Sequence, residues 1–384
     1  MDVQTGVPTV GMVGGGQLAQ MTHQAAISLG QSVRVLSRAA GESAAQVAHD
    51  VVVGDDRSLD DLVAFAAGCD VVTFDHELVP TEHLRALEAK GINLQPSAQA
   101  LPYAQDKQLM RQRLTALGLP CPRWEPIASM ADLARFGDEV GWPVVVKAAR
   151  GGYDGRGVWV VDSPDAGAEL VAQGLPLLAE EHVAITRELA SLVARSPSGQ
   201  SVAWPTVETV QRRGICVEVL APAPELTQGT DEAARALGLR VAAALGVTGV
   251  LAVELFETAG GALVVNELAM RPHNSGHWTI EGARTSQFEQ HLRAVLDYPL
   301  GATELTAPHV VMANVLGARA PVGSLEERLR HTLATWPDVK VHLYGKEHRT
   351  GRKLGHVTAL GTDPSEVARR ARAAAALLAD GRPA

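Results

Sequence analysis

Short β-rich runs alternate with amphipathic stretches over the first 95 residues of the chain. The runs predict five strands, at Thr9–Val13, Val33–Leu36, Asp50–Val53, Val71–Phe74 and Ile92–Leu94. The stretches between them have helical periodicity and predict three helices, at Leu18–Leu29, Leu59–Ala66 and Thr81–Lys90. Strands that alternate with helices are typical of a parallel sheet covered by helices, so we expect an α/β domain here.

The pattern changes beyond this region. Ala104–Leu117 predicts a further helix, and the prolines that follow Gly118 indicate a boundary. A small α/β unit follows from about 125 to 190. Strand signals then dominate to about residue 300, interrupted by a helix at Asp231–Leu245. The last segment predicts three strands and a helix after Pro364, with the strands at Val310–Leu316, Val339–Tyr344 and His356–Leu360.

A glycine-rich loop is the most informative motif. The apolar strand Val144–Val146 ends in Lys147, and four glycines lie among the seven residues Gly151–Gly157 before the next strand, Val158–Val161. Glycines let a backbone turn freely and approach a ligand closely. Successive N–H groups of such a loop can surround phosphate oxygens, and the preceding lysine adds a positive charge. The motif therefore indicates a nucleotide-phosphate site, with a glycine-rich hairpin that binds nothing as the alternative.

A second glycine cluster, Gly14–Gly16, follows the first strand and opens a helix, in the manner of a dinucleotide fingerprint. That fingerprint requires an acidic residue at the end of the next strand, where this chain has Ser37-Arg38. NAD is therefore disfavoured, and an NADP-dependent oxidoreductase using Arg38 stays open. The simpler interpretation is that the helix N-terminus holds the phosphate of another small anion. A tight turn without a ligand is the alternative.

Two carboxylates lie within apolar strands near residue 260. Glu254 interrupts Val250–Phe256, Glu267 interrupts Leu263–Leu268, and the intervening Ala259-Gly260-Gly261 predicts that the two strands form a hairpin. A carboxylate within an apolar strand is costly unless it is paired or binds a metal. With Asn266 they form a set of oxygen ligands suited to Mg²⁺. The alternative is that both glutamates lie on the solvent-exposed face of an edge hairpin and bind no metal.

Four other segments carry candidate polar groups. Asp75 and Glu77 follow a strand whose carboxyl end should face a ligand. Glu180 and Glu188 lie at strand ends near the glycine loop, where carboxylates suit ribose hydroxyls and an adenine amino group. The segment 271–279 has the spacing of a helical zinc pair at His273 and His277, but its proline and glycine favour a polar loop instead. The basic segment 346–353 could be a phosphate or carboxylate clamp, or plain solvated surface.

Composition restricts the function further. The 384 residues are 46% hydrophobic and 20% charged, with a formal net charge of −9, as in an ordinary soluble enzyme rather than a nucleic-acid-binding protein. The three cysteines form no C-x-x-C pair, so neither a zinc knuckle nor a disulfide framework is expected. With no evident signal peptide and no apolar run long enough for a membrane span, we expect a cytoplasmic protein.

Together these motifs resemble the ATP-grasp superfamily, and within it the chain is similar to the 5-(carboxyamino)imidazole ribonucleotide synthases of purine biosynthesis. The combination of Gly151–Gly157 with His273–Trp278 is more specific to that family than either motif alone. The resemblance implies an N-terminal Rossmann-like pre-ATP-grasp α/β domain (1–102), an α+β ATP-grasp domain (103–300) with a lid at about 125–185, and a small C-terminal domain (301–384). It also implies a homodimer that carboxylates aminoimidazole ribonucleotide with ATP, Mg²⁺ and bicarbonate.

The resemblance also implies roles for individual residues. ATP would be bound by Lys107, Lys147, Gly152, Tyr153, Asp154, Gly155, Arg156, Gly157, Glu180, Glu181, His182, Val183, Glu188, Gln211, Asn266 and Glu267. Mg²⁺ would be bound by Glu254 and Glu267. The ribonucleotide or the bicarbonate-derived group would face Gly16, Gln17, Leu18, Asp75, Glu77, Arg271, His273, Asn274, Lys346, Arg352 and Lys353. The residues that close over the reacting atoms would be Tyr153, Arg156, Arg352 and Lys353.

The chain departs from the common family pattern at Lys107, Ala19-Gln20, Asp75 and Gln211, where relatives often have arginine, Gly-Arg, glutamate and histidine. Two other functions stay open. Another ATP-grasp ligase, such as a formate-dependent glycinamide ribonucleotide transformylase, would share the phosphate-binding residues. A non-catalytic ATP-binding regulator would share the fold, although the intact Lys147, Glu254 and Glu267 disfavour it.

Overall fold

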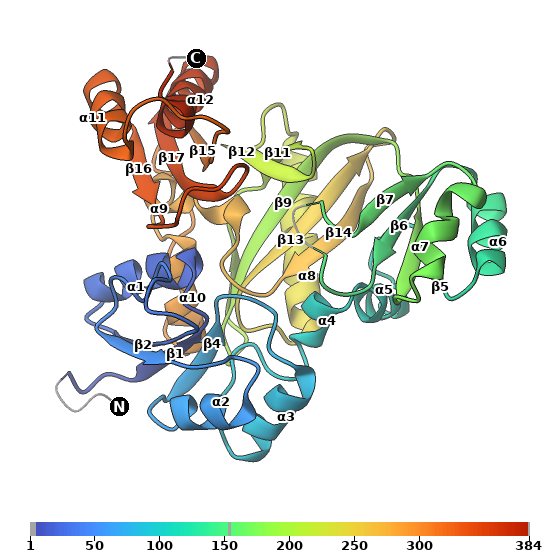
Figure 1. Ribbon diagram of the computed structural model, residues 1–384, viewed down its shortest axis with the longest axis horizontal. Coiled ribbons are helices and arrows are strands. Elements are labelled where there is room, and N and C mark those ends of the chain that lie inside the picture. Colours follow the sequence, from blue (N-terminus) through green and yellow to red (C-terminus); the bar gives the residue numbers. More distant parts are fainter. Residues whose placement is uncertain (1–4, 153–154, 383–384) are drawn as a thin grey trace.

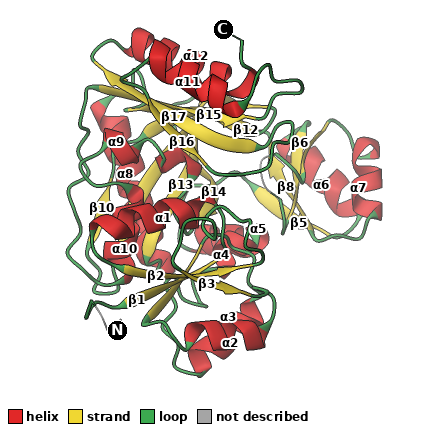
Figure 2. Ribbon diagram, turned by 60° about the vertical axis from the view of Figure 1, so that its left-hand side comes forward, coloured by secondary structure: helices red, strands yellow, loops and turns green. Residues whose placement is uncertain are grey.

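The computed structural model describes residues 5–152 and 155–382, which form three sheets flanked by helices (Figures 1 and 2). The first sheet belongs to the N-terminal segment. Its elements are β1 (Thr9–Val13), α1 (Gln17–Ser28), β2 (Ser32–Ser37), β3 (Asp50–Val53), α2 (Leu59–Ala66), β4 (Val71–Phe74) and α3 (Thr81–Ala89). The four strands are parallel in the order β3-β2-β1-β4, so the predicted parallel α/β arrangement is confirmed.

Two details of the pattern predicted over the first 117 residues are wrong. Ile92–Leu94 does not form a strand: Leu94 makes an isolated parallel bridge to Val72 before the chain turns away at Pro96. The helix predicted at Ala104–Leu117 is two helices, α4 (Pro102–Gln105) and α5 (Lys107–Ala116). Asp106 separates them because it adopts an extended conformation and its carboxylate accepts hydrogen bonds from the first N–H groups of α5.

The second sheet carries the glycine loop and projects away from the rest of the molecule (Figures 1 and 2). Its strands run in the order β5-β8-β6-β7. The elements of this segment are β5 (Trp124–Ile127), α6 (Met130–Val140), β6 (Val144–Ala148), β7 (Val158–Val161), α7 (Ala168–Ala172) and β8 (Leu177–Glu181). The glycine loop joins β6 to β7 and therefore lies at the edge of this sheet that faces the centre of the molecule.

The third sheet is the largest, with nine strands in the order β14-β13-β9-β11-β12-β15-β17-β16 and β10 paired to β9. It continues from the central segment into the C-terminal one through the antiparallel pair β12 and β15. Its central elements are β9 (Ile185–Arg195), β10 (Ser201–Ala203), β11 (Val207–Arg212), β12 (Ile215–Ala221), α8 (Gln228–Leu245), β13 (Gly249–Thr258), β14 (Leu263–Ala269), α9 (Thr279–Gly282) and α10 (Gln287–Val295). The C-terminal elements are β15 (His309–Leu316), α11 (Leu325–Thr335), β16 (Lys340–Leu343), β17 (Lys353–Gly361) and α12 (Pro364–Asp380).

The predicted hairpin of β13 and β14 is confirmed. The strands are antiparallel, and their register places Glu254 directly opposite Glu267. β14 is an edge strand of the nine-stranded sheet, and β13 lies between it and β9. The domain boundaries at 102 and 300 stay predictions, because the continuous third sheet crosses the second of them.

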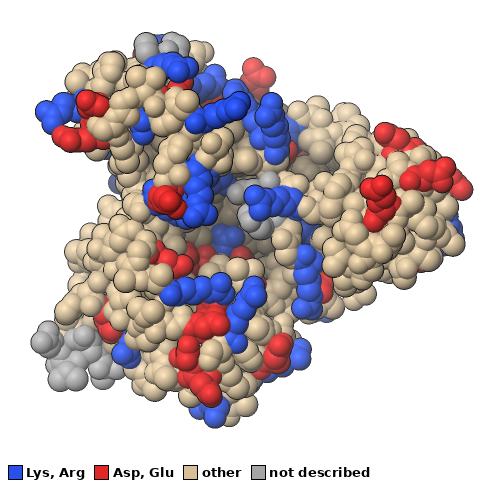
Figure 3. All heavy atoms as spheres, in the orientation of Figure 1, with Lys and Arg blue, Asp and Glu red and all other residues tan. Residues whose placement is uncertain are grey.

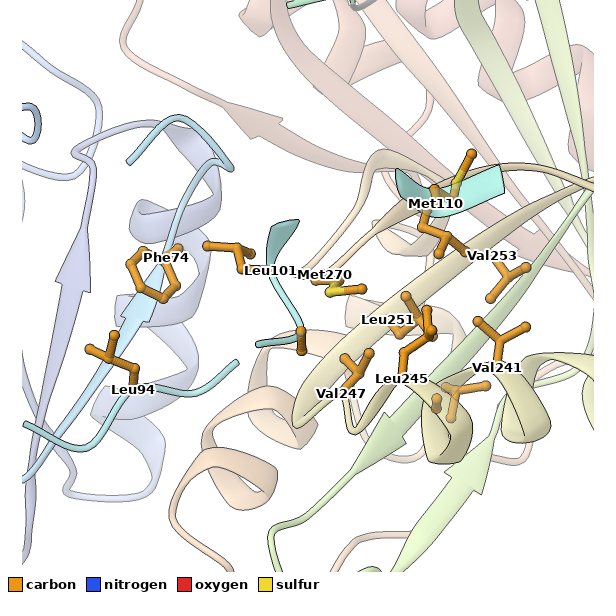
Figure 4. Close-up of a cluster of buried hydrophobic side chains, with 14 of the residues drawn as sticks. Phe74, Leu94, Leu101, Met110, Val241, Leu245, Val247, Leu251, Val253 and Met270 are labelled. Atoms are coloured by element: carbon orange, nitrogen blue, oxygen red, sulfur yellow. The ribbon is translucent and has the colours of Figure 1, made fainter. Parts of the chain in front are cut away.

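One apolar cluster joins the N-terminal sheet to the central one. It includes Phe74 and Leu94 from the first domain, Leu101 just before α4, Met110 of α5 and Leu251 of β13 (Figure 4). All five side chains are buried. Helix α10 adds a second contact, because Leu292 and Val295 pack against buried residues of β1 and β2. Burial of this apolar surface stabilises the relative placement of the two domains, and hence of the polar groups that lie between them.

We expect Leu251→Ala to lower the free energy of unfolding by about 2–5 kcal/mol, since it removes a fully packed side chain and leaves a cavity. The matched control is Leu175→Ala, because Leu175 is 51% exposed and the same truncation there should change the free energy by less than about 0.5 kcal/mol. Urea unfolding followed by fluorescence measures both values. Equal losses for the two variants would contradict the assignment of this cluster as a core.

Candidate active site

The polar centre of the molecule is built around the carboxylate of Glu180, which is only 3% exposed. Lys147 Nζ lies 2.8 Å from one of its oxygens, and Arg111 Nε donates to the other at 2.8 Å. Lys147 comes from β6, Glu180 from β8 and Arg111 from α5. The three charges therefore join the projecting sheet to the helix that precedes it.

Arg111 extends this contact to the hairpin. Its two terminal nitrogens donate to the backbone carbonyls of Val265 at 3.0 Å and Asn266 at 2.8 Å. Lys147 Nζ also donates to Asn266 Oδ1 at 3.0 Å. Every hydrogen-bonding group of the buried trio thus faces a partner, which is the condition under which buried charges are tolerated.

Each of the two titratable groups has a shifted pKa. Burial acts to raise the pKa of Glu180, but Lys147 and Arg111 outweigh it and the pKa is lowered, so the carboxylate is ionised. Burial lowers the pKa of Lys147, and the charge of Glu180 acts against that shift. A lysine held in this way presents a positive charge at a place from which water is largely excluded.

The pattern of the sequence did not predict a role for Arg111. A single arginine on a helix is usually a surface residue, and nothing in its neighbourhood marks it as buried. The available signal was its spacing, since Arg111 lies four residues after Lys107 and the two therefore share a helix face.

Lys107 lies beside this trio, at the start of α5. Its Nζ donates to Glu267 Oε1 at 2.6 Å. The glycine loop passes over it, since a Cβ atom on Gly152 would lie 3.9 Å from Lys107 Nζ and 2.8 Å from the Arg156 carbonyl oxygen. The structure therefore brings together five residues predicted to bind ATP: Lys107, Lys147, Gly152, Asn266 and Glu267.

The carboxylate pair Glu254 and Glu267 adjoins the lysines. Their side chains are half-buried, 27% and 38% exposed. Burial raises the pKa of Glu254, and the charges of Glu267 and Glu188 raise it further. Two carboxylates that repel each other at a partly buried position fit a divalent cation, which would relieve that repulsion. In the described part of the chain, no group of three or more His, Cys, Asp or Glu side chains is arranged to hold a metal.

On the other side of Glu254 lies the His273 segment. His273 Nε2 is 3.4 Å from Glu254 Oε1, and burial, with the charges of Arg271 and Lys353, lowers the pKa of His273 to about 3. His273 is therefore neutral. Arg271 Nε donates to Glu77 Oε2 at 2.7 Å, which ties β14 to the loop after β4. His277 contacts a different residue: its Nδ1 lies 3.0 Å from Gln287 Nε2.

At the N-terminal glycine cluster, the sequence predicted a small anion bound to the first N–H groups of α1, but a side chain of the protein binds two of them. Asp75 accepts hydrogen bonds from the N–H groups of Gly16 at 2.7 Å and Ala19 at 3.0 Å. The Asp75 carboxylate thus binds the N–H groups that were predicted to bind a phosphate. Arg38, the residue considered for NADP, instead donates to the buried Asp56 at 3.0 Å. Gln17 Oε1 accepts from Lys346 Nζ at 2.6 Å, so these two predicted substrate residues meet.

The other predicted residues surround this centre. Glu181 pairs with the backbone of Arg123 at 2.8 Å, His182 is exposed and Val183 is half-buried. Burial raises the pKa of Glu188.

Gln211 lies at a β-bulge opposite Cys216, and Asn274 Nδ2 is buried. Arg352 donates to the Glu347 carbonyl at 3.2 Å, and Lys353 opens β17. Arg156, Gly155 and Gly157 lie in the glycine loop, and Leu18 is buried in α1. Tyr153 and Asp154 lie outside the described residues.

Lys and Arg side chains gather around a hollow at the meeting point of the N-terminal segment, the C-terminal segment and the projecting sheet (Figure 3). Acidic side chains are also visible within that hollow (Figure 3). Basic groups around a few carboxylates can bind a polyanion together with a divalent cation. Within residues 5–152 and 155–382, no helix has both the length and the apolar character needed to cross a bilayer.

Three family profiles match successive parts of the chain. A ribonucleotide synthetase preATP-grasp domain matches residues 7–105, an ATP-grasp domain matches 112–288, and a phosphoribosylaminoimidazole carboxylase C-terminal domain matches 310–370. The fold and the site thus define an ATP-grasp protein with its characteristic preceding and following domains. The fold class predicted from the sequence is confirmed.

Relatives define the class more narrowly. The chain is 58% identical to N5-carboxyaminoimidazole ribonucleotide synthase from Mycobacterium tuberculosis, over 98% of this chain and 89% of the relative. Among solved structures, the Thermus thermophilus N5-carboxyaminoimidazole ribonucleotide synthetase matches with a TM-score of 0.86, 37% identity and coverage of 97% and 99%. The Aspergillus clavatus enzyme in complex with ADP and 5-aminoimidazole ribonucleotide matches with a TM-score of 0.89, 32% identity and coverage of 97% and 98%.

The chain therefore belongs to the N5-carboxyaminoimidazole ribonucleotide synthase family, whose members are ATP-dependent ligases of purine biosynthesis. The family resemblance seen in the sequence is confirmed, and so is the expectation of an enzyme.

We expect Arg111→Met to destabilise the protein by about 3–5 kcal/mol and to weaken ATP binding, because it leaves Glu180 with one partner and frees two carbonyls of β14. The control is Arg113→Met on the same helix, where the side chain is exposed. Urea unfolding and calorimetric ATP titration give both quantities. A variant at Arg111 no worse than the one at Arg113 would show that the trio does not organise the site.

Proposed function

We propose that the protein carboxylates the exocyclic amine of 5-aminoimidazole ribonucleotide, using ATP and bicarbonate, to give N5-carboxyaminoimidazole ribonucleotide, ADP and phosphate. The observation that carries this proposal is an unbroken line of contacts across the centre of the molecule. It runs from Lys147 through Asn266 and Glu267 to Glu254 and on to His273. A nucleotide phosphate at one end and an acceptor at the other would thus share one site.

The reaction has two steps. A bicarbonate oxygen attacks the γ-phosphorus of ATP, the bond to the bridging oxygen breaks, and ADP leaves with carboxyphosphate as the other product. The exocyclic amine then attacks the carboxyl carbon of carboxyphosphate, or CO₂ released from it. Phosphate leaves, and the amine gives up one proton. No covalent bond to the protein is needed, so catalysis rests on positioning and on neutralising charge.

The phosphate end supplies fixed positive charge. Lys147 is held by Glu180, and Lys107 is held by Glu267, so both ammonium groups are placed before the nucleotide arrives. Such preorganised charges cost little reorganisation during the reaction. The adenine and ribose would lie along Glu180–Val183 and Glu188, at the hinge between the projecting sheet and the central one.

The residues at the carboxylate pair fit Mg²⁺. Glu254 and Glu267 face each other across β13 and β14. Burial raises the pKa of Glu254 and the charge of Glu267 raises it further, and a cation would relieve both effects. These two side chains would hold the ion, which when bound would neutralise charge on the transferred phosphoryl group. Arg271 and His273 would then orient the acceptor, with the neutral imidazole able to hydrogen-bond without adding charge.

The glycine loop would exclude water, which hydrolyses carboxyphosphate. A Cβ atom on Gly155 would lie 2.9 Å from Gly214 Cα, so the loop lies against the β11–β12 turn and only glycine fits there. The family resemblance implies that Tyr153, Arg156, Arg352 and Lys353 would close over the reacting atoms. From the family we also propose a homodimer in the cytoplasm, within the domain boundaries predicted from the sequence.

The test of this function is ADP release from MgATP and bicarbonate, with and without aminoimidazole ribonucleotide. We expect the ribonucleotide to stimulate release by at least about tenfold, because capture of the carboxyl group drives the second step. Glycinamide ribonucleotide with formate serves as the control acceptor for a transformylase. ADP release that responds to the control acceptor and not to aminoimidazole ribonucleotide would overturn the proposal.

Replacement of Glu267 by Gln keeps the size of the side chain but removes a charge that both Lys107 and a cation would use. We expect ATP turnover to fall by at least about a hundredfold at 5 mM or lower Mg²⁺, on the order of the loss seen when a charge-stabilising group is removed. Glu304→Gln is the control, since Glu304 is exposed. Near-normal turnover in folded Glu267→Gln protein would remove Glu267 from the metal site.

A further inference from the structure

Three consecutive residues after β16 each contact the N-terminal domain. The ring of Tyr344 packs with Leu18 and Met21 of α1. The carbonyl of Gly345 accepts a hydrogen bond from Gln46 Nε2 at 3.0 Å, and Lys346 Nζ donates to Gln17 Oε1 at 2.6 Å. We call residues 344–346 the bridging segment. It connects the C-terminal sheet to the N-terminus of α1, whose residues Gln17 and Leu18 the family resemblance places near the ribonucleotide.

Tyr344 is the buried part of the bridging segment, only 1% exposed. Its hydroxyl lies 2.8 Å from Nδ1 of the fully buried His356. Burial raises the pKa of Tyr344 and holds the pKa of His356 well below its usual range, so the phenol keeps its proton and the imidazole is neutral. The hydroxyl and Nδ1 therefore share one hydrogen bond, whose donor depends on the imidazole tautomer, and this bond anchors the hydroxyl end of the phenol ring.

His356 is itself held in place. His342, its register partner on β16, stacks on it with ring centroids 4.5 Å apart and an interplanar angle of 13°. His342 Nε2 lies 2.7 Å from Glu281 Oε1 of α9. The imidazole that bonds the tyrosine hydroxyl is therefore held on β17 by His342, and His342 is held in turn by Glu281.

The orientation of the ring matters for Lys346. Its ammonium nitrogen lies 5.5 Å from the centroid of the Tyr344 ring, within the range at which an aromatic face attracts a cation. The same nitrogen reaches Gln17 at the N-terminus of α1. The ring and Gln17 are therefore two of the contacts that place this positive charge near the N-terminus of α1.

We propose that Tyr344 is a positioning residue: its hydroxyl bond to His356 sets the ring that holds Lys346 against Gln17, at the ribonucleotide end of the site. This inference rests on the proposed function. It assigns to Tyr344, His356, His342 and Glu281 a role in affinity for the ribonucleotide, with no contact to the substrate itself.

The experiment measures initial rates for wild-type protein, Tyr344→Phe, Lys346→Met and the double variant, with aminoimidazole ribonucleotide and ATP varied separately. Tyr344→Phe keeps the ring and removes the hydroxyl. We expect its KM for the ribonucleotide to rise roughly three- to tenfold, as for loss of one buried hydrogen bond, with the KM for ATP within twofold of wild type. We expect a larger rise for Lys346→Met, and the double variant should be no worse than Lys346→Met alone.

The control is Tyr298→Phe, because Tyr298 is 37% exposed and should leave both KM values unchanged. His356→Phe, which keeps a ring but removes both ring nitrogens, should reproduce the effect of Tyr344→Phe and serves if that variant does not fold. A KM for the ribonucleotide unchanged in Tyr344→Phe, equal rises in both KM values, or multiplicative effects in the double variant would each overturn the proposal. Wild-type turnover that does not saturate with the ribonucleotide would instead overturn the proposed function.

Discussion

The buried carboxylate of Glu180 is the interaction on which the site depends. It lies between Lys147 and Arg111, and Arg111 in turn binds two carbonyls of β14. A single ion pair buried in this way would be of little net benefit, because desolvation offsets the attraction. Here each charge has a second partner, so the trio fixes the positions of three elements at once. The projecting sheet, helix α5 and the carboxylate hairpin meet through these three side chains.

The geometry of the candidate active site follows from that meeting point. Because Asn266 and Glu267 are adjacent on β14, fixing that strand places one beside Lys147 and the other beside Lys107. The opposite strand then brings Glu254 toward His273. The substrate end is fixed differently, by contacts between domains such as Glu77 with Arg271 and Gln17 with Lys346. One end of the site is thus rigid within a domain, and the other depends on how domains pack.

This difference explains what the sequence could predict. Local patterns predicted the parallel sheet, the glycine loop and the facing pair Glu254 and Glu267, since strand periodicity and turn residues act over short distances. They missed Arg111 and the carboxylate of Asp75 that caps α1, because both depend on contacts more than 50 residues away in the chain. Ile92–Leu94 does not form a strand for a different reason: Leu94 packs in the core, but the chain turns away after one bridge to Val72. The family resemblance supplied roles that no local pattern contains.

The central claim is that ATP activates bicarbonate before the amine is carboxylated. The most direct test supplies bicarbonate labelled with ¹⁸O and measures the label in the released phosphate by mass spectrometry. If carboxyphosphate forms, one bicarbonate oxygen becomes a phosphate oxygen, so we expect one labelled atom per phosphate in each turnover that consumes ribonucleotide. Phosphate without the label, at full ribonucleotide-dependent turnover, would contradict the account, because the oxygen would then have come from water.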